Sequence, residues 1–264
     1  MRENRTPGSV QGASGNRRSY CDAIPLEVSI NPENSPIELI IKLGAHEHMR
    51  SLFEDGVIYM NTLEFYRTLE ADDERRDVNE GAERVRNWRG AILKRKNPEN
   101  GAFEEIAQLT HSRIRELNSN LQNVNVFCSY YLKADMPIKN LGKEVSERAK
   151  LGFGEYAVVV ADAGEFVTRI KQAAAAKGYK HFRSLVKYVD FSQDDFEVGP
   201  FVKDQIFAHQ NELRIAVYTG ENTGTAIQLE IGSLEDIAVM VPAEALDEIS
   251  IQDKANKAMH ATRA

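Results

Sequence analysis

The chain has 264 residues, of which 42% are hydrophobic and 28% charged, and its formal net charge is -7 at pH 7. This length suffices for one domain with a sizeable core. The negative charge argues against a protein that coats nucleic acid non-specifically, although a local basic surface can persist on an acidic whole. The sequence contains neither a stretch of the roughly 20 apolar residues that span a membrane nor an apolar signal segment, so we expect no membrane partner. With only two cysteines, Cys21 and Cys128, we expect free thiols and a cytoplasmic location.

Residues 1–35 are predicted to form a flexible basic tail in front of a single α+β domain at 36–264. The tail is rich in Gly, Pro and Arg and shows little apolar periodicity before Leu26. Such a segment buries too little surface to offset its ordering entropy. An arm that touches a partner or an acidic polymer is the functional alternative.

The first part of the domain alternates between strands and helices. Apolar runs predict strands, and apolar residues at helical spacing predict helices. An acid-rich stretch then predicts a solvated loop. The predicted elements are strands at 37–43 and 57–62, a helix from Ala45 that Gly56 ends, a helix at 63–69 and the loop at 72–83.

A basic stretch without acids follows this loop and surrounds Trp88. Basic residues around an aromatic residue are typical of a surface that contacts phosphates and stacks on nucleic-acid bases. A charged hairpin that balances the acidic loop is the alternative, and the turn expected at 97–101 suits a hairpin. The candidate nucleic-acid contacts are Arg84, Arg86, Trp88, Arg89 and Lys94.

The second part of the domain contains one strand predicted to be buried on both faces, at 156–161. Asp162, with Glu165 three residues later, predicts the start of a helix that ends near Gly178. The order of elements is not a strict strand-helix alternation, so we predict an α+β fold with split, mostly antiparallel mixed sheets and packed helices. Further elements are expected as strands at 124–132, 185–189, 213–218, 225–231 and 237–241, and helices at 144–150 and 245–258.

The segment that leads into the strand at 213–218 carries alternating polar residues, Gln210, Glu212 and Arg214. Strand side chains alternate between faces, so these three would share one face, opposite Leu213 and Ile215. An ordinary half-buried strand with a solvated face gives the same pattern. The alternative is a site in which an amide, a carboxylate and a guanidinium stand in a row.

A set of residues in the C-terminal third carries a family resemblance. These are Val186-Lys187-Tyr188-Val189-Asp190, Phe201-Val202-Lys203, Phe207, Glu212-x-Arg214-Ile215 and the strand at 237–241. They resemble the bacterial and phage family called domain of unknown function 2971, in which a Lys and an aromatic precede Glu-x-Glu-aromatic-Arg. Here Gln210 stands in place of the first Glu and Leu213 in place of the aromatic. The N-terminal half matches only in order, through Ile40-Ile41-Lys42 and Ile58-Tyr59-Met60-Asn61-Thr62.

The same order of elements is similar to the ADP-ribosyltransferase fold, whose split sheets bind NAD in a cleft. The resemblance implies that a polar residue on the first strand, a Ser, Thr or Tyr position on a following strand and a Glu on a later strand line this cleft. His or Arg is usual at the first position. Carried over to this chain, the positions fall on Lys42, on Asn61 and Thr62 or Ser129, and on Glu212, with Gln210 two residues before it.

The resemblance also implies chemical roles. Cleavage of the bond between nicotinamide and ribose builds positive charge on the ribose, which the Glu212 carboxylate would stabilise. Gln210 would orient the incoming nucleophile, and Arg214 would keep Glu212 ionised or meet the pyrophosphate. An aromatic ring would stack on the nicotinamide, from Tyr59, Tyr66 or Tyr130.

We therefore predict an NAD-dependent ADP-ribosyltransferase, of the kind that serves as a bacterial toxin or antiphage effector. Its acceptor would be RNA or DNA, which the basic stretch favours, or else a protein, and an antitoxin would neutralise it. No zinc-spaced set of Cys and His residues is present in the sequence, so no metal is expected. Two alternatives remain: a hydrolase of NAD or another nucleotide on the same fold, and a non-catalytic interaction module.

Overall fold

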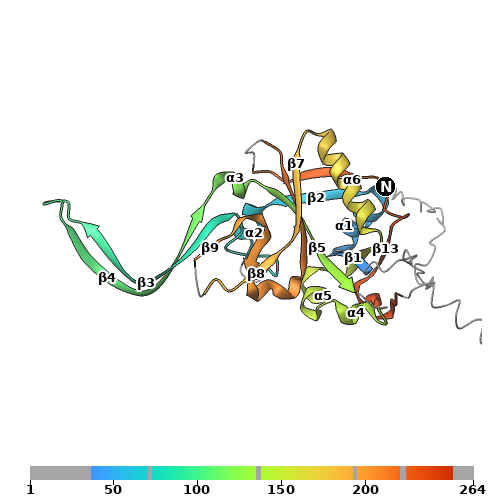
Figure 1. Ribbon diagram of the computed structural model, residues 1–264, viewed down its shortest axis with the longest axis horizontal. Coiled ribbons are helices and arrows are strands. Elements are labelled where there is room, and N and C mark those ends of the chain that lie inside the picture. The colour runs from blue at the N-terminus through green and yellow to red at the C-terminus, as the bar shows by residue number, and fades with distance from the viewer. Residues whose placement is uncertain (1–36, 71–72, 135–137, 193–194, 221–223, 252–264) are drawn as a thin grey trace, which may run out of the picture.

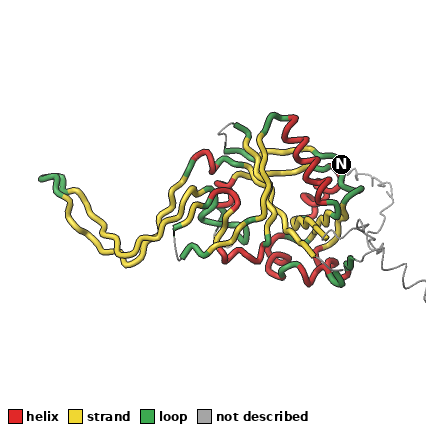
Figure 2. Tube along the Cα trace, viewed as in Figure 1, coloured by secondary structure: helices red, strands yellow, loops and turns green. Residues whose placement is uncertain are grey.

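The computed structural model describes residues 37–70, 73–134, 138–192, 195–220 and 224–251. The predicted tail at 1–35, Cys21 and the end of the helix predicted at 245–258 lie outside this part of the chain. The fold is α+β with mostly antiparallel sheets, as predicted (Figure 1). Figure 2 shows strands running through the body and continuing into a long projecting arm.

In the described residues, the central sheet has eight strands, and six of them follow the order β12-β2-β5-β1-β6-β13. The other two are β11, which pairs with β5, and β7, which pairs with β11. All these pairings are antiparallel. The strands are β1 (Ile37–Gly44), β2 (Val57–Thr62), β5 (Asn125–Ala134), β6 (Tyr156–Val160), β7 (Lys180–Leu185), β11 (Glu212–Tyr218), β12 (Ile227–Glu230) and β13 (Ala238–Pro242).

The sheet divides where β1 and β2 meet β5. Along one edge, β11 pairs with residues 125–130 of β5. Along the opposite edge, β2 pairs with Asn125 and Val126, and β1 pairs with residues 130–134. Between these two pairings, residues 127–129 of β5 face no partner strand among the described residues on that edge. The sheet is therefore split at this point, and the split opens the space in which the candidate site lies.

Hydrophobic side chains cover both faces of the sheet, because neighbouring residues of a strand point to opposite faces. On β1, Ile40 packs in the same core cluster as α6 (Ala163–Ala176). Its neighbour Ile41 packs in the cluster that includes α4 (Leu141–Glu144) and α5 (Glu147–Phe153). Residues of β6 alternate between the same two clusters, which confirms that this strand is buried on both faces.

Two predicted helix boundaries are confirmed. The Asp162 carboxylate accepts a hydrogen bond from the backbone N–H of Glu165 (2.8 Å) and so caps α6. Gly56 ends the first helical segment in the left-handed conformation (φ 66°), and a Cβ there would overlap the backbone of Gly232. The remaining helical segments are α1 (His46–Arg50), a π-helical turn (Ser51–Asp55), α2 (Leu63–Thr68), α3 (Ser119–Gln122) and 3-10 helices at Gly199–Phe201, Gln205–Gln210 and Ala243–Glu248.

The long arm is a two-stranded ribbon made of β3 (Ala82–Lys96) and β4 (Phe103–Leu117) (Figure 1). The turn predicted at 97–101 joins its strands, and the N–H of Gly101 donates to the carbonyl of Asn97 (2.9 Å). At the base of the ribbon, β3 also pairs with β9 (Phe196–Glu197). The hairpin alternative for the basic stretch therefore describes its backbone correctly.

Two predictions about segments near the site are wrong. The loop at 72–83 was expected to be solvated, but Asp77, Asn79 and Glu80 are buried. These residues are buried because they take part in hydrogen bonds and ion pairs of the interior. The strand predicted at 185–189 is interrupted at Val186, and its second half, β8 (Lys187–Val189), pairs in parallel with β10 (Val202–Asp204).

Candidate functional site

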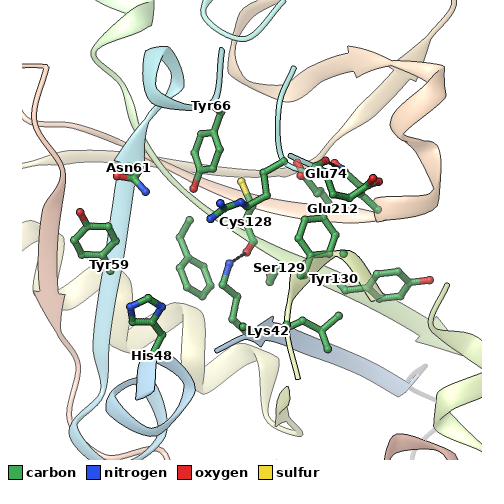
Figure 3. Close-up of a pocket in the computed structure, with 18 of the residues that line it drawn as sticks. Lys42, His48, Tyr59, Asn61, Tyr66, Glu74, Cys128, Ser129, Tyr130 and Glu212 are labelled. Atoms are coloured by element: carbon green, nitrogen blue, oxygen red, sulfur yellow. Dashed lines mark hydrogen bonds between the residues drawn. The ribbon is translucent and has the colours of Figure 1, made fainter. Parts of the chain in front are cut away.

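A cavity of about 1420 Å³ opens at the split between β1 and β2 (Figure 3). It exceeds the roughly 300–1,000 Å³ of typical small-molecule sites, so its volume is sufficient for a ligand as large as a dinucleotide. Thr62 does not line the cavity. Its hydroxyl instead caps α2 by accepting a hydrogen bond from the N–H of Phe65. Eight other predicted site residues do line the cavity: Lys42, Tyr59, Asn61, Tyr66, Ser129, Gln210, Glu212 and Arg214.

Arg214 is the centre of a buried cluster of charges on the cavity wall. Only 1% of the residue is exposed, and its guanidinium forms a two-pronged ion pair with Glu80, with distances of 2.7 and 3.1 Å. It also donates to Oε2 of Glu212 (2.8 Å) and to the carbonyl of Pro200 (2.6 Å). Its Nε is buried and has no hydrogen-bond partner within the described residues. One donor of this guanidinium is thus unpaired within the described residues and shielded from solvent.

Lys203 is the second cation of the cluster. Its Nζ donates to Oε1 of Gln210 (2.6 Å) and to Oε1 of Glu212 (3.2 Å), and it lies 4.7 Å from the centre of the Phe207 ring. Because Glu80 is 3.8 Å away, two cations face two carboxylates. A buried cluster of this kind is tolerated only when each charge has partners.

The environment of Glu212 keeps its carboxylate ionised. Burial alone would raise the pKa of this carboxyl, but the charges of Lys203 and Arg214 and their hydrogen bonds outweigh burial and lower the pKa to about 2. The nearby carboxyl of Asp77 behaves differently: burial and the charge of Glu80 raise its pKa to about 6. Glu212 is therefore a fixed anion at neutral pH.

The backbone places Glu212 at the first residue of β11, where its N–H donates to the hydroxyl of Tyr188 (2.9 Å). Asn211 precedes it with φ 38°, a left-handed conformation that Asn tolerates better than most residues. This residue turns the chain from a 3-10 helix into the strand. Gln210 therefore lies in the helix and does not share a strand face with Glu212, contrary to the sequence pattern.

Both ends of the Gln210 amide are occupied. Its Oε1 accepts from Lys203, and its Nε2 donates to the carbonyl of Glu74 (3.0 Å). Gln210 is buried and acts as a link between the charge cluster and the segment before β3. In this arrangement Gln210 positions Lys203, whereas the role of orienting a nucleophile remains a prediction.

Lys42 fills the gap in the split sheet. Its Nζ donates to the carbonyl of Cys128 (2.6 Å), one of the β5 residues without a partner strand on this edge (Figure 3). It also lies 4.9 Å from the centre of the Phe127 ring. Burial lowers the pKa of the Lys42 ammonium. Burial likewise raises the pKa of the Cys128 thiol to about 11, so this thiol is not an activated nucleophile.

Aromatic and polar side chains complete the walls. Tyr59 is 54% exposed, whereas burial raises the pKa of Tyr66. Ser129 is buried and donates its hydroxyl to the carbonyl of Leu213 (3.3 Å). Tyr130 also borders the cavity, but its hydroxyl donates away from it to the carbonyl of Glu144.

Glu80 and Lys203 are the residues of the cluster that sequence reasoning did not select. Glu80 stands in an acid-rich stretch, where nothing local separates a buried carboxylate from solvated ones. Lys203 could have been selected, since it belongs to the Phe201-Val202-Lys203 motif of the family resemblance. Lys203 lies between Val202 and Asp204, so the local pattern alone does not indicate a buried side chain.

The predicted nucleic-acid contacts lie on β3 of the ribbon and do not line the cavity. Arg84 and Arg86 form ion pairs with Glu116 of β4, and Arg84 also pairs with Glu197. Trp88 is 49% exposed, and Lys94 lies opposite Glu105 in the strand register. Arg89 lies opposite His111. Contact of this stretch with nucleic acid remains a prediction.

Comparison with known proteins gives no match, whether to a family model, a curated protein or a solved structure. Within the described residues no helix is long and apolar enough to cross a membrane. The same part of the chain contains no group of three or more His, Cys, Asp or Glu residues placed to hold a metal ion.

Proposed function

We propose that this chain is an NAD-dependent ADP-ribosyltransferase that binds NAD in the cavity at the split of the sheet. The observation that carries the proposal is an ionised glutamate, Glu212, on the wall of a cavity that also holds aromatic rings and cations. The resemblance to domain of unknown function 2971 and to the ADP-ribosyltransferase fold supports the same assignment. A role as a bacterial toxin or antiphage effector, with a neutralising antitoxin, belongs to this proposal.

Glu212 would act on the ribose. When the bond from the ribose carbon to the pyridinium nitrogen breaks, the nitrogen keeps the electron pair and nicotinamide leaves as a neutral molecule. The positive charge that develops on the ribose is stabilised by a nearby carboxylate. The acceptor then forms a bond to the same carbon and loses its proton. Since its pKa is about 2, Glu212 is ionised throughout the neutral pH range.

Tyr59, Tyr66 and Lys42 would hold NAD, and Arg214 would contribute one donor at most. Tyr59 and Tyr66 offer aromatic faces for the nicotinamide or adenine ring. Lys42 uses one donor on Cys128, so its ammonium has further donors for the ribose or pyrophosphate. Arg214 is occupied by two carboxylates and a carbonyl, and only its Nε is left for the ligand.

Hydrolysis of NAD is the second candidate, and the hydrogen bonds that hold the Gln210 amide favour it. Each end of this amide makes a hydrogen bond to the protein, so only one N–H and one lone pair of Gln210 are left to orient an acceptor. Water would then be the nucleophile. The two reactions differ in their products: transfer gives nicotinamide and a labelled macromolecule, whereas hydrolysis gives nicotinamide and free ADP-ribose.

The experiment is incubation of the protein with adenine-labelled NAD and a mixture of protein, RNA and DNA. Release of nicotinamide with label on one macromolecule supports transfer, and release without such label supports hydrolysis. Intact NAD in every mixture contradicts both and supports the non-catalytic module.

Two variants localise the activity. Glu212→Gln should lower NAD turnover by about 100-fold or more, the usual loss when a group that stabilises transition-state charge is removed. Asp77→Asn is the matched control, because it removes a buried carboxyl that lies near the cluster but does not line the cavity. Full turnover by the Glu212 variant, or equal losses in both variants, would contradict the role of Glu212.

A further inference from the structure

The outer edge of β4 is open along the ribbon. The strand order of this sheet is β4-β3-β9, so among the described residues β4 pairs only with β3. An open edge offers a row of N–H and C=O groups for pairing with another strand. Large apolar side chains are exposed on both strands, with Phe103 67% and Ile106 54% exposed. A two-stranded ribbon with such side chains is marginally stable in water, so a partner that extends it would stabilise it.

The charges on β4 differ between its two ends, apart from Glu116, which lies at the basic end and is paired with Arg84 and Arg86 of β3. Glu104 and Glu105 lie near its start, and Arg113 and Arg115 lie near its end. None of these four side chains forms an ion pair within the described residues. The two arginines donate to the neutral amides of Asn87 and Asn79, and the two glutamates accept from those of Asn97 and Gln108.

We propose that two copies of this chain associate through antiparallel pairing of their β4 edges, around a two-fold axis near Leu109. Antiparallel pairing brings the acidic end of one β4 next to the basic end of the other. Cross-strand pairs of opposite charge stabilise a sheet, and the two-fold axis forms each pair twice. The two ribbons would then form one sheet in the order β3-β4-β4-β3. This inference does not depend on the proposed function.

The charge at the end of the ribbon favours a second copy of this chain over nucleic acid as the binding partner. Between Lys94 and Glu105 the ribbon carries three bases and three acids. Near its base, Arg84 and Arg86 are already paired with acids. The end of the ribbon therefore has no excess positive charge for phosphate contacts, whereas the whole ribbon, 82–117, carries eight Lys or Arg residues and five Glu residues. The β4 edge does suit a copy of itself, because each end of β4 is complementary in charge to the opposite end.

Two double variants test this pairing. Glu104→Arg with Glu105→Arg makes both ends of β4 basic, and Arg113→Glu with Arg115→Glu makes both ends acidic. We expect the unchanged chain to have twice its 29.7 kDa mass in light scattering at micromolar concentration, and each double variant to have the mass of a monomer. An equimolar mixture of the two variants should regain the doubled mass, because every contact then joins opposite charges.

The control is Lys171→Glu on α6, an exposed charge reversal far from β4 in the sequence, which should leave the dimer unchanged. Circular dichroism and thermal unfolding of all variants show whether they are folded. If one double variant fails to fold, the mass of the other, folded one still tests the pairing, and the mixture is interpreted only when both are folded. A monomeric unchanged chain, variants that remain dimeric, or a mixture that remains monomeric would each overturn the proposal. So would a monomer whose ribbon binds duplex DNA or RNA.

Discussion

The charge cluster around Arg214 and the β3–β4 ribbon use charged side chains in opposite ways. In the cluster, charges from segments far apart in the chain are buried and paired with one another. On the ribbon, they are exposed, and most of their partners lie on the adjacent strand of the same hairpin. Electrostatic interactions are strong where water is excluded and weak where it is not. The same substitution should therefore have a large effect in one region and a small one in the other.

The largest expected effect is that of Arg214→Ala. This change leaves Glu80 and Glu212 buried without their principal cation, and removal of one partner of a buried ion pair costs about 3–5 kcal/mol. We expect the free energy of unfolding, measured by urea titration, to fall by this amount. A loss below about 1 kcal/mol would mean that water reaches the cluster and that the contrast with the ribbon is wrong.

Asp77→Asn should have the opposite sign. In the folded chain, burial raises the pKa of Asp77 from 3.8 to about 6, so the folded state binds this proton more tightly than the unfolded state does. Stability that is present below about pH 4 is therefore lost as the pH rises to about 6. The variant should lack this loss and be more stable at pH 7, by about 3 kcal/mol at most.

Urea titrations of this variant and the unchanged chain between pH 4 and pH 7 check the prediction. Glu212 has a lowered pKa, so its contribution is present above pH 4.5 and is lost only as the pH falls toward 2. This contribution is the same in both proteins, so it cancels from the difference between their stabilities. A constant difference between the two proteins across the range would show that Asp77 is not coupled to folding.

Tyr59→Ala separates binding from stability within the cavity. Because the side chain is 54% exposed, its removal should lower the free energy of unfolding by less than about 1 kcal/mol. Under the proposed function it should weaken NAD binding about tenfold, which corresponds to about 1.4 kcal/mol. Calorimetric titration with NAD and thermal unfolding on the same samples measure both. Lys42→Ala should weaken binding too, but with a larger loss of stability, since Lys42 bonds to the open edge of β5.

Local patterns in the sequence predicted many of the elements, but they missed β7, β10 and the 3-10 helix at Gln205–Gln210, and they did not predict the cluster. Asp162 and Gly56 act on their own neighbours, so their roles as helix boundaries could be predicted. The period-two pattern located β11 and its buried residues. The pattern could not show that Asn211 ends it or that Gln210 belongs to a helix. Glu80 meets Arg214 across 134 residues, and only the folded chain brings them together.

The smallest effect is expected on the ribbon, for Arg86→Ala. Arg86 pairs with Glu116 at 2.5 Å, a shorter distance than any ion pair of Arg214, and a ranking by distance alone would make it the stronger pair. Both side chains are more than one-third exposed, however, and exposed ion pairs contribute roughly 0–1 kcal/mol. We expect a loss of less than 1 kcal/mol in the free energy of unfolding, and no loss at about 1 M salt, where the screening length is about 3 Å. Urea titrations at low and high salt, with Arg214→Ala measured in parallel, make the comparison. If the loss for Arg86 matches that for Arg214 and persists in salt, then the ribbon pairs are shielded from water, as they would be if a partner covered them.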